Sequence, residues 1–149
     1  MIFQEEKNYE VDNRTGVNHE GKFANTPVRR LTSTSIIGDK VQNNEGEEIG
    51  KIDNLMINVQ NNNVEYAVIE FGSFLGVGGK LFAIPFSELV LDENRQVFKL
   101  NRDKNYLKEI PGFDKNHWPD TNEHSLNADY YNQVNRYWEV PPNTHSVMV

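Results

Sequence analysis

The central part of the chain, residues 33–102, follows the two-residue period of β-strands. Apolar and polar residues alternate through 55–59, and β-branched and aromatic residues are enriched in 64–71. Turn-forming residues, rich in asparagine and glycine, separate the apolar runs. The pattern predicts an all-β domain with short strands over 35–41, 49–59, 64–71, 81–86, 89–91 and 96–100.

Two local features modify these expected strands. The apolar residues of 49–55 are spaced by three, which breaks the two-residue period, so we expect a bulge or bend near Gly50 or Asn54. Pro85 has no amide hydrogen to donate to a neighbouring strand, so the run 81–86 is expected to end there or to lie at an edge of the sheet.

After the last expected strand the pattern changes to short helices and loops. Asp103 is a suitable N-cap for one or two helical turns over 103–109. Residues 125–139 carry an apolar residue at every fourth position, which predicts an amphipathic helix. We therefore divide the chain into a polar N-terminal arm (1–32), the β-domain (33–102) and a C-terminal extension (103–149) that ends in a flexible tail.

The apolar residues of the extension are the candidate partner-binding site. An aromatic stripe on a terminal helix usually belongs to a core or to an interface. Because the β-domain is small for a chain of 149 residues, we expect this helix to clasp its own barrel or a second copy, which predicts a homodimer. The residues predicted for the interface are Phe113, Trp118, Leu126, Tyr130, Val134 and Trp138.

Composition and charge narrow the class of protein. A formal net charge of −7 argues against direct binding of nucleic acid. The absence of cysteine excludes disulfides and cysteine metal sites, and it fits a cytoplasmic protein. No apolar run approaches the roughly 20 residues of a membrane span, and the first residues lack the basic and apolar regions of a secretory signal.

The segment 72–86, GSFLGVGGKLFAIPF, has the glycines and lysine of a phosphate-binding loop. A Walker A loop ending at Lys80 would need glycine at the position of Phe74 and serine or threonine at that of Leu81. The same leucine breaks the dinucleotide pattern G-x-G-x-x-G. These glycines therefore predict a link between two strands, and we expect no cofactor.

A second candidate for chemistry is the loop 114–124. His117 and His124 lie near Asp114 and Asp120, so a metal site, a small-ligand site or an enzyme using this loop is the alternative hypothesis. The spacing is not that of two ligands on one helical face, and no serine shows a nucleophile-elbow pattern. We therefore predict a non-enzymatic protein with no catalytic residue and no metal site.

Taken together, the central segments resemble a PRC-barrel domain. The resemblance covers about residues 33–102 and rests on IIGDKV, GEEIGKI, YAVIEFG and GVGGKLFAIPF, at 36–41, 46–52, 66–72 and 76–86. The segment 111–120 also resembles an extension found in stand-alone bacterial members. The family includes the cytoplasmic domain of the photosynthetic reaction-centre H subunit and a ribosome-maturation factor, and its fold is a small six-stranded β-barrel.

The resemblance implies an adaptor that docks proteins or supports assembly, without catalytic residues. Stress-related descriptions are common among stand-alone members. The membrane helix of the reaction-centre subunit is absent here, and the polar arm cannot replace the N-terminal domain of the maturation factor. A ribosome-associated assembly factor is therefore a second alternative, behind a protein-binding module.

Overall fold

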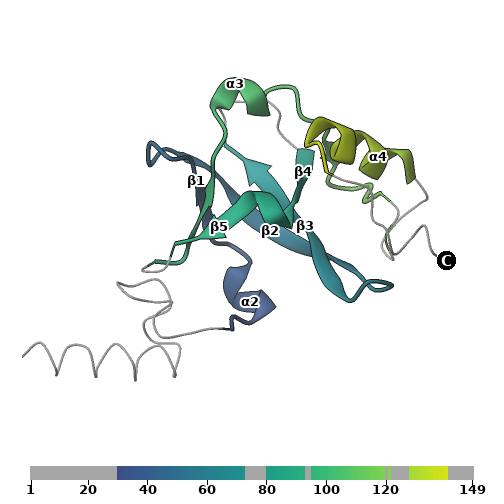
Figure 1. Cartoon of the computed structure of the whole chain (residues 1–149), viewed down its shortest axis with the longest axis horizontal. Coiled ribbons are helices and arrows are strands. Elements are labelled where there is room, and N and C mark those ends of the chain that lie inside the picture. The colour runs from purple at the N-terminus through teal and green to yellow at the C-terminus, as the bar shows by residue number, and fades with distance from the viewer. Residues whose placement is uncertain (1–29, 73–79, 93–94, 120, 122–127, 141–149) are drawn as a thin grey trace, which may run out of the picture.

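The computed structural model describes residues 30–72, 80–92, 95–119, 121 and 128–140, which form a curled β-sheet with short helices around it (Figure 1). Most of the expected arm and all of residues 141–149 lie outside the described residues. In chain order the elements are α2 (Ser33–Ile36), β1 (Lys40–Gln42), β2 (Glu48–Asn58), β3 (Asn63–Phe71), β4 (Lys80–Pro85), the 3-10 helix η2 (Phe86–Glu88), β5 (Leu89–Leu91), β6 (Val97–Leu100), α3 (Lys104–Leu107), β7 (Phe113–Asp114) and α4 (Ala128–Tyr137).

The sheet has seven strands in the order β5-β6-β1-β2-β3-β4-β7. Neighbouring strands are antiparallel except β1 and β6, which are parallel. The predicted all-β architecture is confirmed, with one strand more than the six expected. Among the described residues, the sheet does not close into a hydrogen-bonded barrel. Strand β4 ends at Pro85, as predicted, and η2 then leads the chain to β5 at the other end of the sheet.

Strand β2 contains the predicted bulge. Ile52 pairs with Ile69 but Asn54 pairs with Val68, so Asp53 is an extra residue with no partner in the ladder. The extra residue moves the following side chains of β2 to the other face, which explains the step of three residues from Ile52 to Leu55. The bulge therefore allows β2 to contribute its first part to the barrel and its last part to the hairpin that extends beyond it. The earlier step, from Ile49 to Ile52, contains a second irregularity, since Val41 pairs with Gly50 and Gln42 with Glu48.

The first predicted strand, over 35–41, is wrong in its N-terminal half. Residues 33–36 form one turn of helix, α2, and the strand begins only at Lys40. Both the amide and the hydroxyl of Ser35 donate to the carbonyl oxygen of Thr32, at 3.1 and 2.7 Å, which holds the turn closed. Gly38 then takes a φ of 97° and redirects the chain into β1. Such local hydrogen bonds compete with strand formation without changing the apolar pattern.

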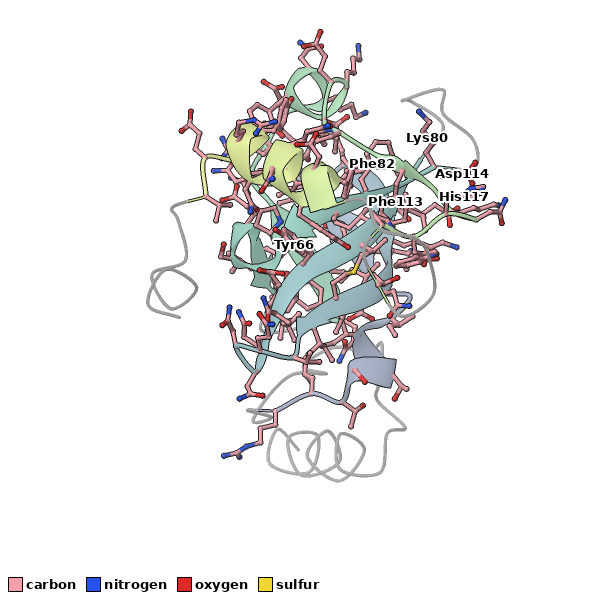
Figure 2. The ribbon with its side chains drawn as sticks, turned by 90° about the vertical axis from the view of Figure 1, so that its right-hand side faces the viewer. Tyr66, Lys80, Phe82, Phe113, Asp114 and His117 are labelled. Carbon is pink, nitrogen blue, oxygen red and sulfur yellow. The ribbon has the colours of Figure 1, made fainter. Side chains whose placement is uncertain are left out.

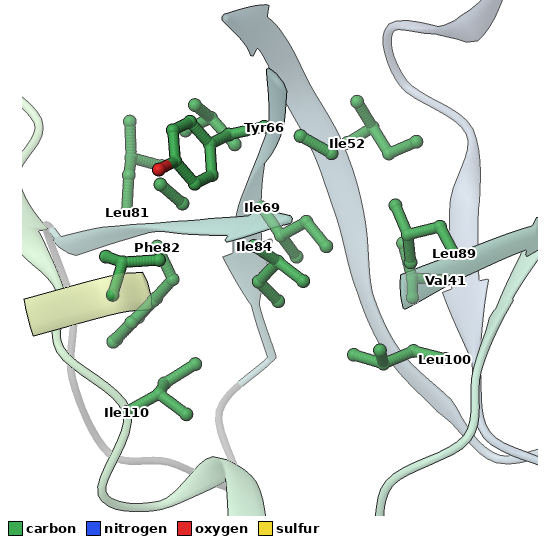
Figure 3. Close-up of a cluster of buried hydrophobic side chains, with 14 of the residues drawn as sticks. Val41, Ile52, Tyr66, Ile69, Leu81, Phe82, Ile84, Leu89, Leu100 and Ile110 are labelled. Carbon is green, nitrogen blue, oxygen red and sulfur yellow. The ribbon is translucent and has the colours of Figure 1, made fainter. Parts of the chain in front are cut away.

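The inside of the curled sheet is filled by aliphatic side chains from both halves. Ile69 and Ile84 lie side by side at its centre, across from Val41, Leu89 and Leu100 (Figure 3). Four of these five side chains have no exposed area, and Leu89 is 9% exposed. Within the described residues, no backbone ladder joins the two ends of the sheet. The packing of these side chains therefore holds the two ends together.

The middle of β3 is buried on both faces. Ala67 and Ile69 face the interior, so Tyr66 and Val68 point to the opposite, outer face. All four are at most 3% exposed. The outer face is covered by α4, which lies beside β4 (Figure 1) and contacts Tyr66 of β3 through Tyr131 and Asn135. This helix was predicted over 125–139; the described part is Ala128–Tyr137.

The N-terminal end of α4 is fastened to the edge of β4. The hydroxyl of Tyr130 accepts a hydrogen bond from the amide of Ala83 and donates one to the carbonyl of Pro111, both at 3.1 Å. Strand β7, which was not predicted, pairs with β4 only at Lys80 and Leu81. A tyrosine hydroxyl therefore completes the cover of this sheet edge, which would otherwise offer free backbone groups.

The C-terminal end of α4 is fastened to α3 by aromatic side chains. The hydroxyl of Tyr106 donates to the carbonyl of Tyr137 at 2.9 Å, and the hydroxyl of Tyr137 donates to the carbonyl of Tyr106. The Arg102 guanidinium lies 4.6 Å from the ring centre of Tyr106 and 5.6 Å from that of Trp138. As predicted, Asp103 caps α3, accepting from the amide of Tyr106 at 2.8 Å.

Gly50 provides a test of the contact between β2 and β3. A Cβ atom there would lie 2.5 Å from the carbonyl oxygen of Glu70, which is held in the ladder. We expect Gly50→Ala to lower the free energy of unfolding by about 3 kcal/mol, measured by urea denaturation. Gly46→Ala is the comparison, because it meets no atom within 4 Å and costs only the strain of positive φ, about 1 kcal/mol. A Gly50→Ala protein as stable as the wild type would contradict this account.

Tyr130→Phe tests the cover of the β4 edge. Loss of the hydroxyl leaves the Ala83 amide without its acceptor, so the free energy of unfolding is expected to fall by about 1–3 kcal/mol. Burial raises the pKa of Tyr130 above its ordinary value of about 10. Its neutral hydroxyl therefore stabilises the fold fully below about pH 10, and this contribution is lost as the pH rises further. Denaturant unfolding should show a smaller difference between the two proteins at about pH 11 than at about pH 8; an unchanged difference would refute the assignment.

Candidate protein-binding surface

The hairpin of β2 and β3 carries exposed apolar side chains at its tip. Ile57 is 61% exposed and Val59 is 80% exposed. Ile57 lies near the end of β2 and Val59 is the first residue of the turn that follows, at the tip of a hairpin that extends beyond the rest of the sheet (Figure 1). Neighbouring exposed apolar residues of this kind are typical of sites that contact other molecules.

The turn of this hairpin is held in a defined shape by Asn58. Its side-chain oxygen accepts from the amides of Gln60 and Asn61, both at 3.0 Å, and its Nδ2 donates to the Glu65 carboxylate at 3.3 Å. Asn62 takes a φ of 57°, which asparagine tolerates better than most residues. The turn, predicted over 61–63, spans 59–62. The exposed apolar residues are therefore presented by a structured hairpin.

A hollow of about 1300 Å³, here called the hairpin hollow, lies beside the hairpin tip. Its lining includes Met56, Ile57, Trp118 and Tyr131. The ring of Tyr131 stacks on that of Tyr66 with 5.2 Å between ring centres. Its hydroxyl donates to the carbonyl of Pro119 at 2.8 Å and lies 3.3 Å from the Met56 sulfur. The hollow thus has one wall from the hairpin and one from the loop and helix that follow the barrel.

A second hollow of about 650 Å³, here called the helix hollow, lies between β3 and the C-terminal part of α4. Glu65 and Tyr66 line both hollows. The Tyr66 hydroxyl donates to the side-chain oxygen of Asn135 on α4 at 2.7 Å. Most of the remaining lining is polar and includes Arg136 and Glu139.

Tyr66 forms the boundary between the two hollows and is electrically neutral. Burial of its ring, with a smaller effect from the charge of Glu65, raises its pKa to about 12, against the opposing effect of the Asn135 hydrogen bond. Its proton is engaged by Asn135, so Tyr66 is suited to fixing the shape of the surface and not to accepting a proton from a substrate.

Residues 29–111 match the PRC-barrel domain family. This match covers more than half of the chain and every strand of the sheet except β7. The chain belongs to the PRC-barrel domain family. No curated protein matches it. In the described part of the chain, no helix is long and apolar enough to cross a membrane.

The PRC barrel supplies only one wall of each hollow. The hairpin side of both hollows falls within the family match, whereas Trp118, Tyr131 and Asn135 come from the extension after it. The two walls meet at Tyr66, which contacts Tyr131 and Asn135. The surface is therefore a joint product of the family domain and of the extension that follows it.

The structure places the six predicted interface residues in three different settings. Leu126 lies outside the described residues. Trp118 is half-buried and lines the hairpin hollow, with its ring centre 5.1 Å from that of Phe113. The other four are at most 7% exposed and pack within the chain: Phe113, Tyr130, Val134 and Trp138. The interface stays a prediction. Of the five predicted interface residues that the structure describes, Trp118 is the one that lines an accessible hollow.

The alternative site in the loop 114–124 is described in part. His117 Nδ1 lies 3.8 Å from Asp114 Oδ2, and both side chains are more than half exposed. Figure 2 shows these two side chains next to Lys80, with which Asp114 pairs across the strands. Asp120 and His124 lie outside the described residues. Among the residues that are described, no three histidine, aspartate or glutamate side chains gather into a possible metal site.

The exposed pair Ile57 and Val59 is the part of this surface that sequence reasoning missed. The alternation of 55–59 predicts that its apolar side chains lie on a buried face of the sheet, whereas Ile57 and Val59 are exposed. The available signal was position: these residues adjoin the turn, where a hairpin can extend past the body of a small barrel. Only the structure shows that α4 covers the hairpin up to Tyr66 and not to its tip.

Asn58→Ala tests whether the hairpin tip depends on its side-chain hydrogen bonds. Loss of three bonds is expected to lower stability by about 1 kcal/mol and to speed amide exchange at Gln60 and Asn61, measured by hydrogen–deuterium exchange. Asn54→Ala is the matched control, since within the described residues its side chain accepts a single bond, from the neighbouring amide of Leu55. Equal exchange in the two variants would show that the turn holds its shape without Asn58.

Proposed function

We propose that this PRC-barrel protein is a non-enzymatic docking module that binds a protein partner at the tip of the β2–β3 hairpin. One observation carries the proposal: Ile57 and Val59 are exposed on a structured hairpin, directly beside the hairpin hollow. Burying two such side chains contributes roughly 1.5–3 kcal/mol each, enough to anchor a small interface.

The chemistry of the surface supports binding over catalysis. Tyr66 is neutral and hydrogen-bonded, and the Tyr131 hydroxyl is engaged by Pro119. The loop 114–124, the alternative site, contributes Lys115 and Trp118 to the lining of the hairpin hollow. We propose that this loop acts as a wall of the docking surface. A cytoplasmic location belongs to the proposal because the chain has no cysteine. A stress-related setting belongs to it through the family resemblance alone.

The predicted homodimer remains part of the proposal in a more specific form. Tyr130, Val134 and Trp138 are buried against their own barrel, so a second copy could take them up only by exchange of α4 between chains. Light scattering at high micromolar concentration tests this: a mass of two chains is expected, and a strict monomer would refute the dimer without affecting the hairpin proposal.

Site-specific cross-linking in the native cell tests the docking role. A photoreactive amino acid at position 57 or 59 is expected to capture one protein repeatedly, identified by mass spectrometry. The same amino acid at position 90 is the control for non-specific cross-linking, because Val90 lies on β5 and is 64% exposed. Capture of ribosomal proteins from the hairpin positions would identify the ribosome-associated alternative, and identical products from all three positions would refute a hairpin site.

The double variant Ile57→Asp/Val59→Asp separates binding from folding. Both side chains are mostly exposed, so the free energy of unfolding should change by no more than about 0.5 kcal/mol per site. Binding of the captured partner, measured by calorimetry with purified proteins, should fall at least about tenfold, since two buried aliphatic contacts are lost. Val90→Asp should bind as the wild type does. Unchanged affinity of the double variant would exclude the hairpin as the docking site.

A further inference from the structure

The two hollows adjoin each other, because Glu65 and Tyr66 line both of them. At one end lie the exposed apolar residues Ile57 and Val59. At the other end, beyond Tyr66, the helix hollow is lined mainly by polar side chains of β3 and α4. A partner segment that starts at the hairpin tip and passes Tyr66 therefore meets apolar side chains first and polar side chains after them.

The barrel side of the two hollows carries one charged side chain, the carboxylate of Glu65, and no lysine or arginine. Glu65 lies at the junction of the two hollows. Its Oε2 accepts from Asn58, which leaves Oε1 for a further donor. The basic side chains of the lining, Lys115 and Arg136, both come from the extension, and both are exposed.

Glu139 adds a second carboxylate to the helix hollow. It follows α4 in a left-handed conformation, with φ of 56°, in a turn closed by the bond from the Val140 amide to the Asn135 carbonyl. Glycine is the usual residue at this position, and a negative charge at a helix C-terminus is unfavourable. No ion pair within the described chain compensates this exposed carboxylate.

Asparagine side chains on both sides of the helix hollow complement a peptide backbone. Asn63 comes from β3, and Asn132 and Asn135 lie three residues apart on one face of α4. Each amide has a donor and an acceptor, as a peptide group does. Because the Tyr66 hydroxyl occupies the oxygen of Asn135, the Nδ2 of Asn135 is left to donate to a peptide carbonyl.

We propose that the two hollows together bind an extended segment of the partner protein that carries a lysine or arginine close to an apolar residue. This rests on the docking function proposed above and specifies its chemistry. The apolar residue packs on Ile57 and Val59, the basic side chain lies between Glu65 and Glu139, and the backbone of the segment is held by the asparagines. The net charge of −7 favours approach of a basic segment.

Selection of random 12-residue peptides displayed on phage, with the full chain as target, tests this inference. Enriched peptides are expected to combine lysine or arginine with a nearby Val, Ile, Leu or Phe. A synthetic copy of the most enriched peptide is then titrated by fluorescence anisotropy against three proteins: wild type, Glu65→Gln/Glu139→Gln, and the control Glu45→Gln/Glu109→Gln, which removes two exposed carboxylates elsewhere.

Neutralising the two carboxylates of the hollow should weaken this peptide about tenfold and reduce the salt dependence of binding, whereas the control should bind within about twofold of the wild type. Enriched peptides that are apolar only, and bind the Glu65→Gln/Glu139→Gln protein as tightly as the wild type, would overturn the basic specificity and leave the hairpin docking site intact. Peptides that bind Ile57→Asp/Val59→Asp as tightly as the wild type, or no enrichment at all, would overturn both.

Discussion

The structure depends on the need to cover the outer face of β3. Four consecutive residues of this strand, from Tyr66 to Ile69, are buried, although a strand points its side chains alternately to two faces. A sheet curled around one interior can bury only one of those faces. The second face requires another layer, and α4 supplies it.

The fastening of α4 follows from this requirement. At one end the Tyr130 hydroxyl takes the place of a neighbouring strand for the Ala83 amide, and at the other end Tyr106 and Tyr137 exchange hydrogen bonds between side chain and carbonyl. The helix is thereby placed across β3 while the hairpin tip stays uncovered. The two hollows and the exposed apolar pair are the direct result of where this cover ends.

Features with a local cause could be predicted from the sequence. The bulge at Asp53, the end of β4 at Pro85 and the cap at Asp103 each follow from spacing or from one side chain. The stripe on α4 was also recognised, because period and aromatic content identify a packed face. What that face packs against depends on the position of the barrel in space, so the same spacing could not distinguish a core from a partner interface.

Two short elements escaped prediction, because α2 depends on the hydrogen bonds of Ser35 to Thr32 and β7 is too short for any period to be seen. Features that arise from contacts between distant segments also escaped prediction. The open sheet could not be foreseen, since a strand count does not say which ends pair. The docking surface belongs to the same class, because Glu65 and Glu139 are 74 residues apart by number and share a hollow only through the seating of α4.

Each hollow has one wall inside the family domain and one wall in the extension. Selection can therefore act separately on the residues that hold the fold together and on those that determine which partner is bound. The barrel, whose hairpin is tied into the sheet, changes with difficulty because its residues also hold the core. The exposed positions of the extension, such as Asn132, Arg136 and Glu139, bear little of the fold's stability. A lineage could therefore retarget this barrel to a new partner by changing these exposed positions of its C-terminal segment, with the buried face of α4 and the anchoring hairpin left as they are.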